Sequence, residues 1–120
     1  MENLKKLYLD DIRNPVNDNY IIVRSYHEAV QYIKNNNIPN YISFAHDLGI
    51  NEDWTVAPTG FDFAKWLVEM YLDNTYKFPD NFKFYVHTAN PVGKHNIETL
   101  INNYLNFKFI KETKFDKITF

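Results

Sequence analysis

Cysteine is absent from this chain of 120 residues, which excludes disulfide bonds, a thiol nucleophile and cysteine-ligated zinc, and which fits a reducing compartment. Apolar runs of membrane length are absent too, and the amino end (MENLKKLYLDD) lacks the apolar core of a signal peptide. We therefore expect a cytoplasmic protein with no membrane contact. A formal net charge of -2 gives no reason to expect a broad polyanion-binding face.

What is present is enough apolar material for a packed core. Hydrophobic residues make up 45% of the chain and aromatic residues 18%, so we expect one folded domain covering residues 1–120. Strand-like runs are expected at Leu4–Leu9, Tyr20–Arg24, the start of Tyr41–Gly49, Phe82–His87 and Phe107–Ile110, with an edge strand at Phe115–Phe120 paired as a hairpin across Lys111–Lys114.

Helix starts separate these strands. Ser25 with Glu28 and Thr59 with Asp62 have the spacing of capping boxes, and Asn90-Pro91 is a favourable N-cap followed by a proline in the first turn. Helices that alternate with strands predict a parallel sheet covered on both faces. The stretch Asp11–Asn19 is short for a parallel crossover. Either that crossover has lost its helix, or the first two strands are arranged differently.

Polar side chains follow three of the expected strands at the point where each strand ends. In an open α/β sheet, ligands bind in the crevice beyond the carboxyl ends of the strands. These ends carry Asp10 and Asp11, then His46 and Asp47, then His87, Thr88 and Asn90. The sequence therefore predicts a single site at this edge of the sheet.

The adjacent carboxylates of Asp10 and Asp11 repel each other, and a hard divalent cation would relieve that repulsion. With Asp47 as a third oxygen ligand, they form a candidate Mg²⁺ site. Two adjacent aspartates also occur simply because acidic residues open loops. The sequence leaves both interpretations open.

The histidines are candidates for proton transfer. The pKa of an exposed imidazole lies near neutrality, so His46 and His87, with Asp47 beside the first of them, are the expected catalytic groups. Taken alone, either histidine is more often a structural residue bonded to a backbone group. Their expected convergence on one rim favours catalysis.

Phosphate binding is expected from the third helix start. The first turn of a helix leaves backbone N–H groups unpaired, and Gly93 would let a ligand approach them closely. Thr88, Asn90 and Lys94 flank this turn, and Arg13 is a second candidate for holding a phosphoryl group. An ordinary capped helix explains Asn90-Pro91 equally well.

Four motifs in order give the chain a family resemblance. The segments LYLDDIRNP, the strand ending in HDLG, TGFDFAKWL, and HTANPVG followed by Asn96-Ile97 together resemble the cyclic-phosphate-processing receiver-like domains, relatives of response-regulator receivers proposed to work in RNA repair. The resemblance implies a receiver- or flavodoxin-like three-layer sandwich whose mainly parallel sheet has five strands. It also implies that Asp10 and Asp11 are the metal-binding pair and that Thr88-Ala89 matches the receiver Thr/Ser-Ala.

Two departures from that pattern bear on activity. Ala45 stands where the family usually has an acidic residue, at the position of the receiver phosphoacceptor, and Asp47 lies two residues further along. The receiver lysine that precedes a proline has no match, because neither Lys108 nor Lys111 is followed by proline. Signalling by aspartyl phosphorylation is therefore not expected.

Three functions remain. The first is a Mg²⁺-assisted phosphoesterase, a hydrolase that processes a cyclic phosphate on RNA or a nucleotide by histidine acid–base chemistry. The second is a catalytically silent protein that sequesters a nucleotide signal, which Ala45 favours. The third is a receiver-like interaction domain. The expected partner is a nucleotide or an RNA end carrying a phosphate, and the sequence leaves the oligomeric state open.

Overall fold

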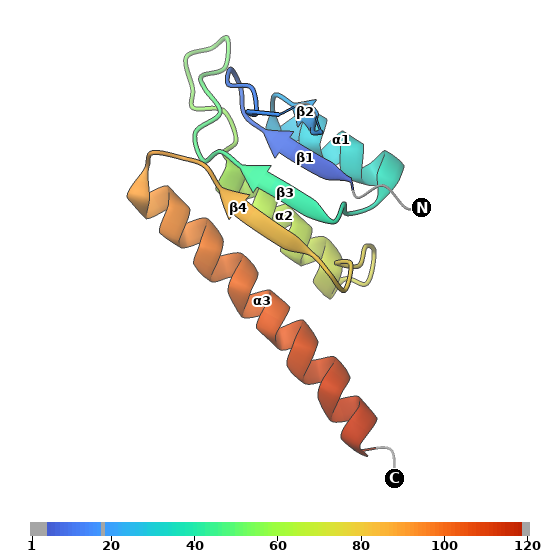
Figure 1. Cartoon of the computed structure of the whole chain (residues 1–120). Coiled ribbons are helices and arrows are strands. Elements are labelled where there is room, and N and C mark those ends of the chain that lie inside the picture. The colour runs from blue at the N-terminus through green and yellow to red at the C-terminus, as the bar shows by residue number, and fades with distance from the viewer. Residues whose placement is uncertain (1–4, 18, 119–120) are drawn as a thin grey trace.

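The protein folds around a parallel sheet (Figure 1). The computed structural model describes residues 5–17 and 19–118, with side chains described up to residue 107. Its elements are β1 (Lys6–Leu9), β2 (Ile21–Val23), α1 (Tyr26–Asn36), β3 (Tyr41–Phe44), α2 (Gly60–Leu72), β4 (Lys83–Val86) and α3 (Pro91–Ile118). The strands lie in the order β2-β1-β3-β4, and every neighbouring pair is parallel. The expected parallel α/β architecture is confirmed.

The short first crossover joins two parallel strands. β1 and β2 pair directly, with Leu7 opposite Ile21 and Leu9 opposite Val23. The connection between them holds no helix in its described residues, 10–17 and 19–20. Of the two arrangements that the sequence left open, the crossover without a helix is the correct one.

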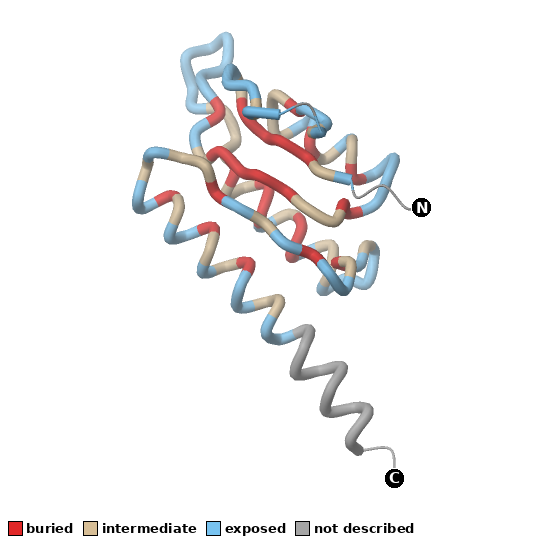
Figure 2. The backbone as a smooth tube through the Cα atoms, in the orientation of Figure 1, coloured by how far each residue is buried: buried red, intermediate tan, exposed pale blue. Residues whose placement is uncertain are grey.

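The core lies between the sheet and the helices. Leu7, Leu9, Ile42, Phe44 and Val86 are at most 1% exposed and point toward α1 and α2. These side chains share one face of the sheet, because successive residues of a strand point to opposite faces. Tyr8 and Ser43, on the other face of the central strands, are buried as well. Figure 2 shows the buried segments concentrated along the central strands.

The helices of the described part lie on one face of the sheet. Both helical crossovers, β2-α1-β3 and β3-α2-β4, progress in the same direction across the sheet, so right-handed connections place α1 and α2 together. α3 follows β4 and packs against α2. In Figure 1 the strands stand in front of α1 and α2, and no described helix crosses the near face. A second helical layer, as in the expected three-layer sandwich, is therefore not formed by the described elements.

The carboxyl end of the chain was predicted wrongly. Residues 107–110, expected as a strand, lie inside α3, and so do residues 111–118, where a hairpin and an edge strand were expected. Residues 119–120 of that expected strand lie outside the described residues. The sheet has four strands in the described part instead of five. The sequence explains the helix, because no glycine or proline follows Gly93 to end it.

A glycine lets α2 approach the end of β3 closely. A Cβ atom on Gly60 would overlap the carbonyl oxygen of Ala45, so only glycine allows α2 to begin against that strand end. The N–H of Gly60 donates to the carbonyl of His46 at 2.8 Å. The predicted capping box of Thr59 and Asp62 is formed in full and fixes the same helix start.

Candidate functional site

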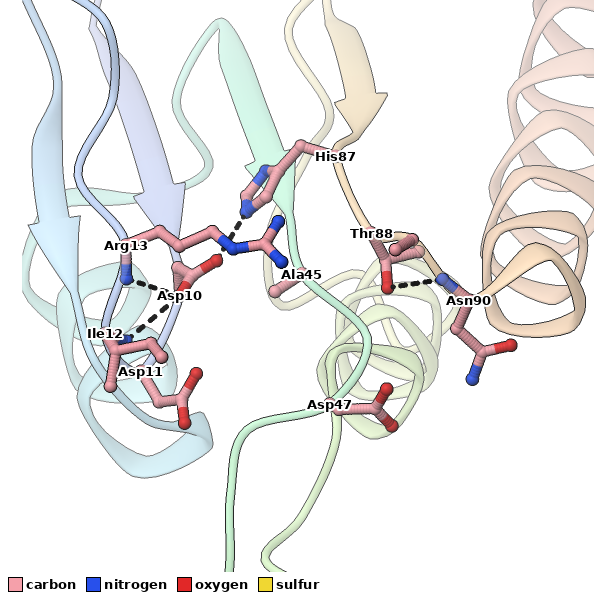
Figure 3. A pocket seen from close by; sticks show the side chains of 10 residues that line it. Asp10, Asp11, Ile12, Arg13, Ala45, Asp47, His87, Thr88 and Asn90 are labelled. Atoms are coloured by element: carbon pink, nitrogen blue, oxygen red, sulfur yellow. Dashed lines mark hydrogen bonds and ion pairs between the residues drawn. The ribbon is translucent and has the colours of Figure 1, made fainter.

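A small pocket opens at the carboxyl ends of β1, β3 and β4, where the sequence predicted the site (Figure 3). Its volume is about 160 Å³. Its walls are formed by Asp10, Asp11, Ile12, Arg13, Ala45, Asp47, His87, Thr88, Ala89 and Asn90. Three segments that are distant in the sequence thus meet, because parallel strands bring their carboxyl ends to one edge.

Asp10 is a buried carboxylate with an internal partner for each oxygen. Oδ1 accepts hydrogen bonds from the backbone N–H groups of Ile12 (3.0 Å) and Arg13 (2.7 Å), and Oδ2 lies 3.0 Å from Nε2 of His87. Burial raises the pKa of Asp10, but these hydrogen bonds outweigh it and hold the pKa below its ordinary value. Asp10 is therefore ionised at neutral pH and organises the loop after β1.

His87 is held on both sides of its ring. Nε2 faces Asp10, and Nδ1 lies 2.7 Å from Oγ of Ser43. The ring also stacks on Tyr8, with centroids 4.4 Å apart and planes within 1°. Burial lowers the pKa of His87 more than the neighbouring carboxylate of Asp10 raises it. The ring is thus neutral near pH 7, which assigns Nε2–H as the donor to Asp10 and Nδ1 as the acceptor from Ser43.

Ser43 and Tyr8 contact His87 although the sequence did not predict either of them as a site residue. Ser43 is 4% exposed and completes a Ser-His-Asp series, but its burial makes it a group that orients the ring and not an accessible nucleophile. The available signal was a single polar residue inside an apolar strand. No feature of the sequence marked Tyr8 as a site residue, because an aromatic residue in a strand is usually expected to belong to the hydrophobic core.

Arg13 brings a positive charge to a pocket whose walls also hold three carboxylates. Its N–H is fixed by Asp10, and its carbonyl accepts a hydrogen bond from Nη1 of Arg24. Nη1 of Arg24 also donates to the carbonyl of Asp10, and Nη2 donates to Oδ1 of Asn14. Figure 3 shows the Arg13 guanidinium reaching across the pocket toward Ala45. It is well placed to meet an anion.

The three predicted metal ligands reach the pocket, but they do not form a preassembled cluster. Within the described residues, no three histidine or acidic side chains are close enough together to hold a metal ion. Asp11 and Asp47 line the pocket with exposed or half-exposed carboxylates, whereas both oxygens of Asp10 already accept hydrogen bonds. Mg²⁺ is often held by only one or two carboxylates together with water and substrate phosphates. The donor set fits that kind of site.

His46 does not reach the pocket with His87. Its Nδ1 lies 2.9 Å from Oδ1 of Asp47, and its ring lies against α3, where a Cβ on Gly93 would come within 2.5 Å of two ring carbon atoms. Gly93 and Lys94 are also absent from the pocket walls. The first turn of α3 is thus used for packing on His46.

Thr88 and Asn90 cap α3 at the pocket edge. Oγ1 of Thr88 accepts from the N–H of Asn90 at 3.2 Å, and Oδ1 of Asn90 accepts from the N–H of Gly93 at 3.1 Å. The predicted N-cap is confirmed. The Gly93 amide, predicted as part of a phosphate cradle, is already paired within the cap. A ligand would meet the side chains of Thr88 and Asn90.

Comparison with known proteins gives a family and a fold. The sequence matches the family described as the cyclic-phosphate processing receiver domain over residues 5–103. A comparison with curated proteins found no match. A solved structure whose title reads yeast Spc42 trimeric coiled-coil, amino acids 181–211, fused to another structure, is similar with a TM-score of 0.51 at 15% identity. The alignment covers 83% of this chain and 65% of that one, so it supports the fold alone.

No helix within residues 5–17 and 19–118 combines the length and the apolar character needed to cross a bilayer.

Proposed function

Because this chain belongs to the family of cyclic-phosphate processing receiver domains, we propose that it is a phosphoesterase that opens a 2′,3′-cyclic phosphate on a nucleotide or an RNA end. The observation that carries the proposal is that one pocket of about 160 Å³ contains both the Arg13 guanidinium and the hydrogen-bonded His87 and Asp10 side chains. An anion-binding group beside a proton-transfer pair is what the reaction requires.

Arg13 would hold the phosphoryl group. A guanidinium presents two parallel N–H donors that match two phosphoryl oxygens, and its charge opposes the negative charge that develops there in the transition state. Thr88 and Asn90, on the opposite wall, add neutral polar side chains. The small pocket suits a phosphoryl group and the adjoining ribose edge, since pockets that enclose a whole ligand are usually about 300–1,000 Å³.

His87 would supply the proton. A bound phosphate places negative charge beside the ring, and this raises the His87 pKa because an opposite charge favours the protonated form. Water then adds to phosphorus, one ribose P–O bond breaks, and the protonated His87 ring gives its Nε2 proton to the leaving ribose oxygen, for which Nε2 must exchange its hydrogen bond with Asp10 for one with the substrate. Asp47 accepts the proton of the attacking water. The product is a nucleoside phosphate monoester with one free hydroxyl, and Ser43 keeps the ring oriented through Nδ1 while Nε2 acts.

The proposal is tested by turnover of a 2′,3′-cyclic mononucleotide, followed by separation of cyclic and opened products. Arg13→Ala is expected to lower kcat/KM by about 10²–10³-fold, the usual effect of removing one donor that stabilises transition-state charge. Arg13→Lys should recover only part of this loss, because an ammonium lacks the paired donors. Lys34→Ala, an exposed charge in the last turn of α1, is the matched control. Equal rates in wild type and Arg13→Ala would contradict the assignment.

Magnesium is proposed to bind only together with the phosphate. Asp11 and Asp47 would hold it with water and a phosphoryl oxygen, and when bound it would neutralise phosphate charge. In calorimetry we expect no measurable Mg²⁺ binding to the free protein and clear binding once a nucleoside 3′-phosphate is present. Asp11→Asn or Asp47→Asn should remove this coupling, while Glu52→Gln, on an exposed loop, should keep it. Tight Mg²⁺ binding by the free protein would refute the coupled site.

A second function is favoured by two observations at the same pocket. Ala45 offers no carboxylate at the pocket wall, and both ring nitrogens of His87 already have partners. Under this alternative the protein binds the cyclic phosphate and releases it unchanged. Reversible binding of the cyclic nucleotide, with no opened product after prolonged incubation with Mg²⁺, would show that the protein sequesters the nucleotide and does not hydrolyse it.

A further inference from the structure

The sheet face that α1 and α2 leave uncovered carries aromatic and basic side chains, and of these the proposed reaction uses only His87, which Ser43 orients. We call it the open face; by the alternation of side chains along the strands, it consists of Lys6, Tyr8, Tyr20, Ile22, Tyr41, Ser43, Lys83, Tyr85 and His87. Tyr8 and Ser43 at its centre are buried, and Ile22, Lys83 and Tyr85 are its exposed members. The four strands contain two lysines and no aspartate or glutamate, and both lysines belong to this face. Its charge is therefore positive, although the whole chain is slightly acidic.

Ring contacts run along the open face from the pocket toward the opposite end of the sheet. His87, in the pocket wall, stacks on Tyr8, whose ring meets Tyr20 edge-on at 5.6 Å. Tyr20 meets Tyr41 at 6.1 Å, and Nζ of Lys6 lies 5.7 Å from the centre of each of those two rings. The open face is thus continuous with the proposed site.

A second cavity lies at the end of the sheet opposite the pocket. It measures about 180 Å³ and is lined by Lys6, Asn40, Tyr41, Asn81 and Lys83. Asn40 donates from Nδ2 to Oδ1 of Asn81 at 2.8 Å, which holds two amide side chains at its edge. Two ammonium groups and two amides, with an aromatic wall, form a surface suited to a phosphodiester and a base.

Tyr85 is the most exposed aromatic ring of the open face. It lies within β4, the strand that His87 directly follows, and 52% of it is accessible. Nζ of Lys94 lies 5.5 Å from the ring centre, so the ring has a cation beside it. An exposed tyrosine on a strand, with lysines around it, is a platform on which a nucleobase can stack in any sequence.

The size of the pocket indicates what lies over this platform. At about 160 Å³ it suits the phosphoryl group and the adjoining ribose edge, and it is smaller than the pockets that usually enclose a whole ligand. We therefore expect the base and any further nucleotides to rest on the surface next to the pocket. The open face adjoins the pocket through His87 and offers rings and positive charge, which are the two features that bind single strands.

We propose that the open face binds the single-stranded RNA segment that precedes the cyclic phosphate, so that the preferred substrate is an RNA end and not a mononucleotide. Tyr85 and Tyr41 stack bases, while Lys83 and Lys6 face phosphodiesters. A four-stranded sheet with exposed aromatic rings holds two or three bases in this manner. The inference rests on the proposed function for the position of the RNA end, and on the open face alone for the binding of the strand.

The experiment measures binding of a 5′-labelled eight-nucleotide RNA ending in a 2′,3′-cyclic phosphate by fluorescence anisotropy, with a 2′,3′-cyclic mononucleotide as competitor. Wild type should bind the oligonucleotide at least roughly tenfold more tightly than the mononucleotide. Tyr85→Ala should weaken oligonucleotide binding by about 5- to 150-fold, the effect of losing one stacked base, and should leave mononucleotide binding unchanged. Tyr85→Phe, which keeps the ring, should bind like wild type.

The lysines are tested by the salt dependence. Each phosphate neutralised on a single strand contributes about −0.7 to the slope of log K against log salt concentration. Lys83→Ala should therefore make the slope less steep by about 0.7. Lys65→Ala is the matched control, because Lys65 lies on α2, where its Nζ is 5.8 Å from the Phe61 ring, away from the open face.

Three results would overturn the inference. One is equal affinity of wild type for the oligonucleotide and the mononucleotide. Another is loss of the preference in Trp54→Ala and not in Tyr85→Ala, because Trp54 is 85% exposed on the loop after β3 and would then be the stacking residue. The third is a dimer in sedimentation that Tyr85→Ala dissociates, which would make the open face an interface between two copies of the chain.

An oligonucleotide ending in a plain 2′,3′-diol separates this inference from the proposed function. Tyr85-dependent binding that is equally tight for the diol and the cyclic phosphate supports the open face and refutes cyclic-phosphate recognition. Tighter binding of the cyclic phosphate, with no effect of Tyr85→Ala, supports the pocket and refutes the open face.

Discussion

His87→Ala is expected to lower kcat for opening of a 2′,3′-cyclic nucleotide by about 10²–10⁴-fold, the range for loss of a general acid or base. His87 is the one imidazole in the pocket walls, and Asp10 and Ser43 orient it from both sides. Single-turnover kinetics would measure the chemical step directly. Substrate affinity should change much less than kcat, because Arg13 continues to hold the phosphate.

His46→Ala is the matched control for this prediction. From the sequence alone, the two histidines are expected to have equivalent roles, whereas the structure places the His46 ring against Gly93 and outside the pocket. We expect His46→Ala to retain kcat within a few-fold and to lose some stability through packing at α3. A larger loss of kcat in His46→Ala than in His87→Ala would assign proton transfer to His46 and refute the role given to His87.

Asp10→Ala is expected to have the largest effect on stability, lowering the free energy of unfolding by about 3–5 kcal/mol. Asp10 is 3% exposed and accepts bonds from two backbone N–H groups and from His87. The substitution leaves these three donors without an acceptor. Urea denaturation would measure the loss. Asp11→Ala, which removes a carboxylate that accepts none of these three bonds, should change stability by roughly 0.5 kcal/mol or less.

The pH dependence provides a second check on Asp10. Because its pKa is lowered on folding, the ionised carboxylate stabilises the wild type above the unfolded pKa of about 3.9, and this stabilisation is lost as the pH falls through the lower folded value. The difference between wild type and Asp10→Ala should therefore be constant near neutral pH and shrink in strong acid. A difference that persists unchanged at pH 2 would show that Asp10 stabilises the fold by packing and not by charge.

The sequence predicted the site to the extent that strand ends reveal it. Asp10, Asp47 and His87 follow apolar runs, and a parallel sheet necessarily gathers those ends, so their meeting required only the strand assignments. The orientation of His46 could not be predicted in the same way. Because successive side chains in an extended segment point to opposite sides, Ala45 and Asp47 face the pocket and His46 faces away from it. This assignment requires knowing at which residue the strand ends.

The fold was predictable where helix signals were explicit and unpredictable where they were weak. Thr59 with Asp62 and Asn90 with Pro91 mark helix starts by local hydrogen-bonding chemistry, which does not depend on the rest of the fold. The residues after Leu105 mix lysine with aromatic residues, and this pattern is compatible both with the two-residue repeat of a strand and with the continuation of a helix. Local sequence alone did not decide between them, and α3 runs through to Ile118.

Arg24 has a consequence for the thermodynamics of ligand binding. Its guanidinium joins the carbonyls of Asp10 and Arg13 and the side chain of Asn14, so the loop that carries Arg13 is tied down before any ligand arrives. The conformational entropy of that loop is lost during folding, and association does not have to freeze it again. The affinity of the proposed ligand would thus be set in part by a residue outside the pocket walls, and loosening that residue should appear as an entropic penalty on binding.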